Sequence, residues 1–203
     1  MNIRNETLDP DAFYHIYNRG INNGKIFSSE ENQRFFLTKF GMYLNPVCEV
    51  YAYCLMPNHF HILLKVKSRK ELDEFLIKAN KSSHDPDGLH SSANIVSKQI
   101  GKWISSYSQA FNKIENRHGS LLESPFKRKR IEDEVYFKNA IIYIHRNPII
   151  LKQDFESYRF SSYATILSDS TSNIKRNEVL DIFGDKSNFI YAHKHPEDFD
   201  FEY

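Results

Sequence analysis

Hydrophobic and polar positions along the chain follow two different repeats, one of about two residues and one of three to four. Short runs rich in β-branched and aromatic residues predict four strands. The predicted strands are 13–20, 48–56, 59–66 and a short one near 125–131. Apolar residues spaced three and four apart predict four helices. These helices span 28–44, 68–79, 96–114 and 132–147.

The order of these elements predicts an α+β fold. A strand, a helix, two strands joined at Pro57-Asn58, a helix and a final strand give a ferredoxin-like β-α-β-β-α-β antiparallel sheet. The helix 132–147 is additional to this plan and can cover part of the other face. It must end near Asn147, because Pro148 disfavours helical geometry in the residue before it.

The sequence further predicts how the chain divides into domains. Residues 1–167 are expected to form one catalytic domain, with residues 168–203 as a C-terminal helical appendage packed on it. The polar stretch 80–94 contains Pro and Gly and is expected to be a loop or an insertion. The seam of the helix 96–114 is either core or a helix-pairing surface.

Two histidines stand two residues apart in the predicted strand "MPNHFHILLKV" (56–66). Successive side chains of a strand point to opposite faces, so His59 and His61 share one face and the apolar Phe60 and Ile62 share the core face. Neutral imidazole is the commonest side-chain metal ligand and a frequent acid or base. The pair either forms a site or sits on a half-exposed sheet, and other residues must decide.

A stripe of polar side chains on the helix 132–147 offers partners for these histidines. Asn139, Tyr143 and Asn147 are four residues apart and therefore lie on one side of the helix. The carbonyl oxygen of Asn147 can be a third metal ligand, and Tyr143 can hold its hydroxyl near the same ion. The alternative is a C-terminal Asn with a packed Tyr one turn above it.

The charges nearly cancel, with 27 Lys and Arg against 26 Asp and Glu and a formal net charge of +1. Any nucleic-acid binding must therefore come from a local basic patch. The candidates are Lys127, Arg128, Lys129 and Arg130, together with Arg146 at the end of the last predicted helix. Aromatic residues make up 14% of the chain, which suits stacking on bases as well as an ordinary core.

The two cysteines and the apolar windows bear on the compartment. Cys48 and Cys54 lie in one predicted strand without a C-x-x-C pair, which favours a reducing interior. No window resembles a signal-peptide core or approaches the roughly 20 apolar residues of a membrane span. A soluble, cytoplasmic protein without membrane partners is expected.

Three segments resemble the signatures of the single-tyrosine transposases, and above all of the REP-associated tyrosine transposases. The segments are "YHIYNRG", "CLMPNHFHILLKV" and "YIHRNP", and the resemblance runs from about residue 13 to 163. It implies that His59 and His61 are the metal-binding pair, that Tyr143 is the nucleophile and that Asn147 completes the metal site. The catalytic residues would then be Tyr143, His59 and His61, with Mg²⁺ or Mn²⁺ as the cofactor.

The same resemblance implies a reaction and its partners. A transposase of this kind cleaves single-stranded DNA by attack of the tyrosine, which gives a 5′-phosphotyrosine link and a free 3′-hydroxyl. The link conserves the energy of the phosphodiester, so the site can join it to another 3′-hydroxyl in DNA transposition or its domesticated equivalent. The expected partners are single-stranded or hairpin DNA and a second copy of the chain, which would contact the first through residues 95–115 or a sheet edge.

Several alternatives stay open at this point. The protein can instead bind hairpin nucleic acid without cutting it, or be a metal-dependent phosphodiesterase that uses water. Tyr107 is the rival nucleophile, but it lies on an apolar helix seam and is followed four residues later by Phe111, which favours a core position. His15 and Tyr17 share one face of the first strand, where they line either the site or only the sheet.

Overall fold

The computed structural model describes residues 7–79 and 92–197. At its centre lies a four-stranded antiparallel sheet with the order β2-β3-β1-β4. The strands are β1 (Phe13–Arg19), β2 (Cys48–Met56), β3 (His59–Val66) and β4 (Lys127–Ile131). The first strand lies between the third and the fourth, which is the ferredoxin-like arrangement, so the predicted fold class is confirmed.

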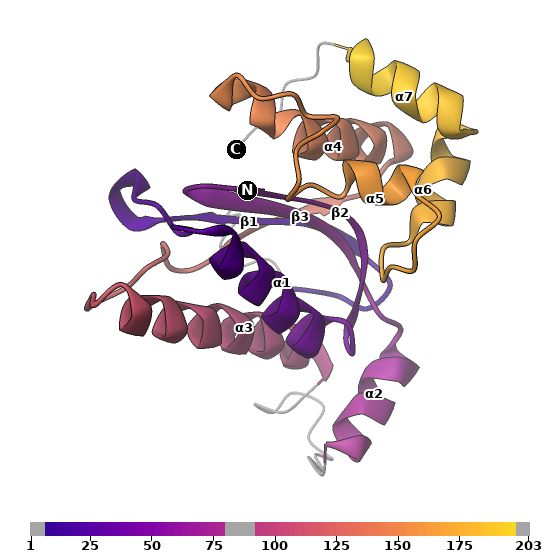
Figure 1. Ribbon diagram of the computed structural model, residues 1–203. Coiled ribbons are helices and arrows are strands. Elements are labelled where there is room, and N and C mark those ends of the chain that lie inside the picture. Colours follow the sequence, from indigo (N-terminus) through magenta and orange to yellow (C-terminus); the bar gives the residue numbers. More distant parts are fainter. Residues whose placement is uncertain (1–6, 80–91, 198–203) are drawn as a thin grey trace.

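Helices cover both faces of this sheet (Figure 1). One face carries α1 (Glu30–Leu44) and α3 (Ser92–Ile114), and α2 (Arg69–Lys78) lies beside α3. The other face carries α4 (Glu134–Arg146) and the C-terminal helices (Figure 1). These are α5 (Tyr163–Leu167), α6 (Arg176–Phe183) and α7 (Lys186–Lys194). Two short 3-10 helices, η1 (Ile21–Asn23) and η2 (Asn147–Leu151), follow β1 and α4.

Side-chain caps explain where several helices begin. The Ser29 hydroxyl accepts a hydrogen bond from the backbone of Asn32 at the start of α1. Ser68 and Glu71 form a reciprocal capping box at the start of α2. The Asp133 carboxylate accepts from the backbone of residue 136, so α4 begins just after the predicted start of that helix.

The sheet separates two apolar clusters. Phe60 and Ile62 point into the cluster formed with α1 and α3, as the alternation predicts. Tyr107 of α3 is buried in the same cluster, which confirms its predicted core position and shows that the seam of α3 faces the interior. A dimer contact through residues 95–115 stays a prediction, and it would use the exposed side of α3. Leu63 points the other way, into the cluster that α4 forms with Val179 and Phe189 of the C-terminal helices.

The expected loop 80–94 lies between α2 and α3 in the chain. Most of the expected loop 80–94 lies outside the described residues, although α3 already begins at Ser92. The β-α-β-β-α-β order leaves open whether the helix 68–79 or the helix 96–114 covers the sheet. In the structure, α3 packs beside α1 and buries a long apolar seam in the core, whereas α2 buries Leu72 and Leu76.

Over residues 7–79 and 92–197, no helix has both the length and the apolar character needed to cross a membrane.

Candidate active site

The structure brings the four central predicted residues together between β3 and α4. His59 and His61 point from β3 toward α4, and their ring centroids lie 5.2 Å apart at an interplanar angle of 86°. The ring of Tyr143 meets His61 edge to face at 5.3 Å. Asn147 follows one turn later, and its side-chain oxygen lies 3.2 Å from His59 Nε2. Tyr143 and Asn147 of the helix stripe therefore face the histidine pair.

The hydrogen bonds around His59 fix which of its ring nitrogens faces Asn147. Asn58 Oδ1 lies 2.7 Å from His59 Nδ1 and can only accept, so Nδ1 carries the proton. The neutral ring then has its lone pair at Nε2, which faces Asn147 Oδ1. Asn147 Nδ2 donates to the Tyr143 carbonyl at 3.0 Å, which keeps that oxygen turned toward the ring. Two acceptors thus face each other, an arrangement that a shared cation would stabilise.

His61 is held from behind by His15. His15 Nε2 and His61 Nδ1 are 2.9 Å apart, and both side chains are buried. When His61 Nδ1 donates the proton of this bond, Nε2 becomes the basic nitrogen of the ring. Metal-binding histidines usually have their second nitrogen fixed in this way. Burial lowers the pKa of His61 well below its usual value, and burial also lowers that of His59.

A pocket of about 460 Å³ opens over these rings. It is lined by His59, His61 and Tyr143 and by residues of β1 and of the chain before β4. The ring of Tyr17 stacks on that of His61, with their centroids 5.7 Å apart. Burial is the main cause of the raised pKa of the Tyr17 phenol. The pocket is large enough for part of a nucleotide chain.

Charged side chains stand at the rim of this pocket. Glu123 pairs with Arg19 at 2.7 Å and with Lys127 at 3.7 Å. The hydrogen bond from Arg19 lowers the pKa of the Glu123 carboxyl, so this group is ionised at neutral pH. Lys127 also lies 5.8 Å from the centre of the Tyr17 ring. The rim thus holds two cations near one anion.

The basic run Lys127–Arg130 is divided between the two faces of β4. Lys127 and Lys129 pair with Tyr17 and His15, on the face of the candidate site. Arg128 and Arg130 point to the opposite face, where Arg128 bonds to Ser97 at 3.1 Å and Arg130 to Asp9 at 2.8 Å. The strand alternation therefore places only half of the run beside the pocket.

Arg146 does not line the pocket that holds the histidine pair. Its guanidinium donates to the backbone carbonyl of His193 in α7 and lies 5.4 Å from the centre of the Phe155 ring. This residue connects the end of α4 to the C-terminal helices.

The sequence left several residues of the site unassigned. Alternation put His15 and Tyr17 on one strand face, but only the strand register sets Tyr17 opposite His61. Asn58 is visible in the sequence only as a turn residue. Arg19 and Glu123 are more than a hundred positions apart, and no spacing rule connects them.

The donor set suits a divalent cation bound by nitrogen and oxygen. Within the described ranges, no group of three or more His, Cys, Asp or Glu side chains is placed to hold a metal ion. The candidate set consists of the imidazoles of His59 and His61 and the amide oxygen of Asn147, which faces His59. Such a mixed set, with few protein ligands, fits an ion that takes further oxygens from a bound phosphate.

The fold and this site define an α+β protein in which a tyrosine on a helix faces paired histidines on a sheet. No protein-family model matches the chain, and no curated protein matches it. A solved structure with a similar fold is that of a REP-associated tyrosine transposase bound to a REP hairpin. The two chains superpose with a TM-score of 0.50 at 14% sequence identity, over 83% of this chain and 86% of that one. The likeness shows a shared fold, and any relationship it reflects is distant.

Proposed function

We propose that this protein is a DNA strand transferase of the single-tyrosine transposase type. The observation that carries the proposal is that the Tyr143 ring and the two imidazoles line one pocket, with the Asn147 oxygen against His59. A helix that only packed on the sheet would not need an amide oxygen against the half-buried imidazole of His59. The shared fold with a transposase supports the proposal.

The reaction would proceed by attack of Tyr143 on a phosphodiester of single-stranded DNA. The tyrosine oxygen forms a bond to phosphorus while the bond to the 3′ oxygen breaks. The tyrosine gives up one proton and the departing 3′-hydroxyl gains one, so the step needs no nucleotide cofactor. In the reverse direction another 3′-hydroxyl attacks the phosphotyrosine, which joins two strands and restores Tyr143.

The cofactor of this proposal is Mg²⁺ or Mn²⁺, with His59, His61 and Asn147 as its protein ligands. When bound, the ion would neutralise charge on the scissile phosphate. His15 would keep His61 in the tautomer that presents Nε2, and Asn58 would do the same for His59. These two neighbours are positioning residues, because their contacts act through the ligand rings.

The proposed substrate is single-stranded or hairpin DNA. Arg19 and Lys127 would contact phosphates at the pocket rim, and Tyr17 offers an aromatic ring beside them. The similar transposase is bound to a DNA hairpin, which supports this choice. At one salt concentration the protein should bind a hairpin with single-stranded flanks more tightly than a blunt duplex of equal length. Equal affinity would contradict this part of the proposal.

The decisive experiment is a search for a covalent adduct. A labelled single strand with a hairpin is incubated with the protein and Mn²⁺, and the linked peptide is identified by mass spectrometry. We expect the adduct on Tyr143 and its loss in Tyr143→Phe, with folding and DNA binding close to normal. Tyr107→Phe is the matched control, because Tyr107 is buried on the other side of the sheet and its variant should keep the adduct.

The other outcomes identify the alternative functions. Binding without cleavage would indicate a hairpin-binding protein, and hydrolysis without an adduct would indicate a phosphodiesterase that uses water. Metal binding has a separate readout: His59→Ala and His61→Ala should weaken the binding of Mn²⁺ measured by calorimetry in the presence of DNA. Unchanged Mn²⁺ affinity in both variants would refute the ligand set.

A homodimer is part of the same proposal. The contact would use either the exposed side of α3, within residues 95–115, or an edge of the described sheet, where β2 and β4 are the outermost strands. Light scattering at micromolar concentration should give twice the 24.0 kDa mass of the chain. A monomer under these conditions would contradict the dimer without touching the cleavage chemistry.

A further inference from the structure

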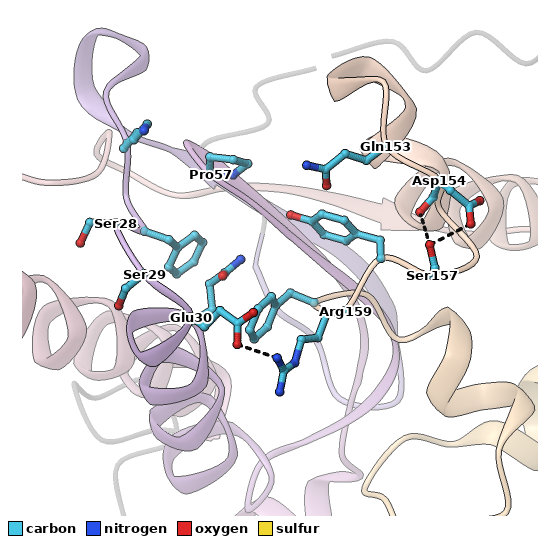
Figure 2. A pocket seen from close by; sticks show the side chains of 13 residues that line it. Ser28, Ser29, Glu30, Pro57, Gln153, Asp154, Ser157 and Arg159 are labelled. Carbon is cyan, nitrogen blue, oxygen red and sulfur yellow. Dashed lines mark hydrogen bonds and ion pairs between the residues drawn. The ribbon is translucent and has the colours of Figure 1, made fainter.

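A second pocket, drawn in Figure 2, is lined at one side by Pro57 of the β2–β3 turn, whose next residue lines the candidate active site. Its volume is about 620 Å³, and two segments far apart in sequence form its walls. One wall is the chain that leads into α1, with Ser29 and Glu30 at its helical end. The other wall is the segment 153–160, which contributes Gln153, Tyr158 and Arg159.

The two pockets are adjacent along the chain. Pro57 lines the second pocket and Asn58, the next residue, lines the first. The Pro57 carbonyl accepts backbone hydrogen bonds from Ile26 at 2.8 Å and Phe27 at 3.1 Å, which fixes the turn against the chain that leads into α1. Consecutive Cα atoms are only about 3.8 Å apart. A nucleotide strand that passes over this turn would connect the two pockets.

The walls of the second pocket combine aromatic rings with hydrogen-bonding groups. Tyr158 is half-buried, and its hydroxyl donates to the Leu55 carbonyl at 2.8 Å, which fixes the ring at the pocket wall. The Arg159 guanidinium bonds to the Glu30 carboxylate at 2.6 Å (Figure 2). The Gln153 amide also lines the space. A flat ring with donors and acceptors on its edge would fit such a lining.

The charges of the second pocket favour a neutral ligand. Lys25 and Arg159 supply two positive charges, and Glu30 and Asp154 supply two negative charges. A phosphate-rich ligand would meet both carboxylates, whereas a nucleobase carries no charge and can bond to either sign. The first pocket, with Arg19 and Lys127 at its rim, is the place for phosphate.

We propose that the second pocket binds one nucleobase of the single-stranded DNA next to the cleaved phosphate, stacked against Tyr158. The inference rests on the proposed function, because it takes the strand in the first pocket to be DNA. It adds to that function a pocket that would discriminate among the bases at one position of the single-stranded flank. The discrimination would come from hydrogen bonds to the Gln153 amide, the Glu30 carboxylate and the Arg159 guanidinium.

Fluorescence of 2-aminopurine tests the position of the base. The probe is a DNA hairpin whose single-stranded flank carries one 2-aminopurine, moved one position at a time, with the full chain and with EDTA present to prevent cleavage. Stacking on an aromatic ring quenches this base, so we expect quenching to be strongest at one position close to the scissile phosphate. Equal fluorescence at every flank position would overturn the proposal.

Two variants of Tyr158 separate stacking from folding. Tyr158→Phe keeps the ring and loses only the bond to the Leu55 carbonyl, whereas Tyr158→Leu loses the ring as well. Because base–aromatic stacking contributes roughly 1–3 kcal/mol, Tyr158→Leu should bind the hairpin roughly 5- to 150-fold more weakly than Tyr158→Phe and abolish the quenching. Equal affinity and equal quenching in the two variants would refute the role of the ring.

A pocket-filling variant gives an independent check. Ser157→Leu places a branched aliphatic side chain in the pocket and should reduce the quenching, while Glu156→Leu, at a neighbouring exposed position outside the pocket, should not. The results are separable from those of the adduct experiment. An adduct on Tyr143 without position-specific quenching defeats the base pocket alone. Quenching that depends on Tyr158 in a protein that forms no adduct supports the base pocket and defeats the proposed cleavage.

Discussion

The buried histidine pair between α4 and α7 should make the stability of this protein fall steeply in mild acid. His193 is fully buried, and its Nδ1 lies 2.7 Å from the Phe189 carbonyl, which can only accept. Its Nε2 therefore accepts the bond from His145 Nδ1, at 2.8 Å. Both rings are neutral in this arrangement, and an added proton on His193 would face the His145 donor.

The size of this loss in the free energy of unfolding follows from the pKa shift of His193. Burial, as the largest cause, lowers the pKa of His193 from 6.5 to about 4. Below pH 6.5 the unfolded chain takes up a proton on this histidine, while the folded chain does not until the pH approaches 4. The free energy of unfolding is therefore highest above pH 6.5 and falls as the pH is lowered toward 4. Between pH 7.5 and pH 5 the loss from His193 alone is about 2 kcal/mol.

Urea unfolding at pH 7.5 and pH 5 measures this loss, with His193→Phe as the comparison. The Phe ring keeps most of the packing against Phe189 but cannot titrate, and it leaves the His145 donor without its acceptor. The variant should therefore be less stable at pH 7.5 by roughly 1–3 kcal/mol. Between pH 7.5 and pH 5, the free energy of unfolding of the variant should fall by about 2 kcal/mol less than that of the native chain. Parallel losses in the two proteins would refute the argument from His193.

Three further predictions concern the frame and the rim of the site. A Cβ atom on Gly20 would lie 2.0 Å from the backbone oxygen of Gly24, so Gly20→Ala should cost about 2 kcal/mol or more in thermal unfolding; an unchanged melting temperature would contradict this close approach. Lys127→Ala should weaken hairpin binding at every sequence and reduce the slope of log affinity against log salt by about 0.7, whereas an unchanged slope would remove Lys127 from the phosphate contacts. Ser68→Ala removes the capping box with Glu71 and should cost about 1 kcal/mol of stability without changing DNA binding, as measured by urea unfolding and fluorescence anisotropy.

Local chemistry was enough to predict most elements of the fold. The alternation in β3 separates the histidines from the apolar core face because successive side chains of a strand point to opposite sides. Spacing by four puts Tyr143 and Asn147 on one side of α4 for the same kind of reason. These are properties of a single element, so the sequence displays them before any element is packed.

The contacts between elements were decided by the tertiary structure. The bond between His15 and His61 depends on the register of β1 against β3, which no local repeat specifies. The basic run of β4 reads as one patch in the sequence, but the pleat sends Arg128 away from the site. Arg146 looks like a residue of the site because it precedes Asn147, yet its contact is with α7.

The sequence by itself determined the strands, the helices and the face on which each candidate side chain lies, because these follow from backbone geometry and the spacing of apolar residues. Only the tertiary structure decided that Asn58 and Asn147 meet the two sides of one imidazole, and that Pro57 divides two pockets. The contact between His59 and Asn147 joins residues 88 positions apart, and it is selected by the packing of α4 on the sheet rather than by any local preference.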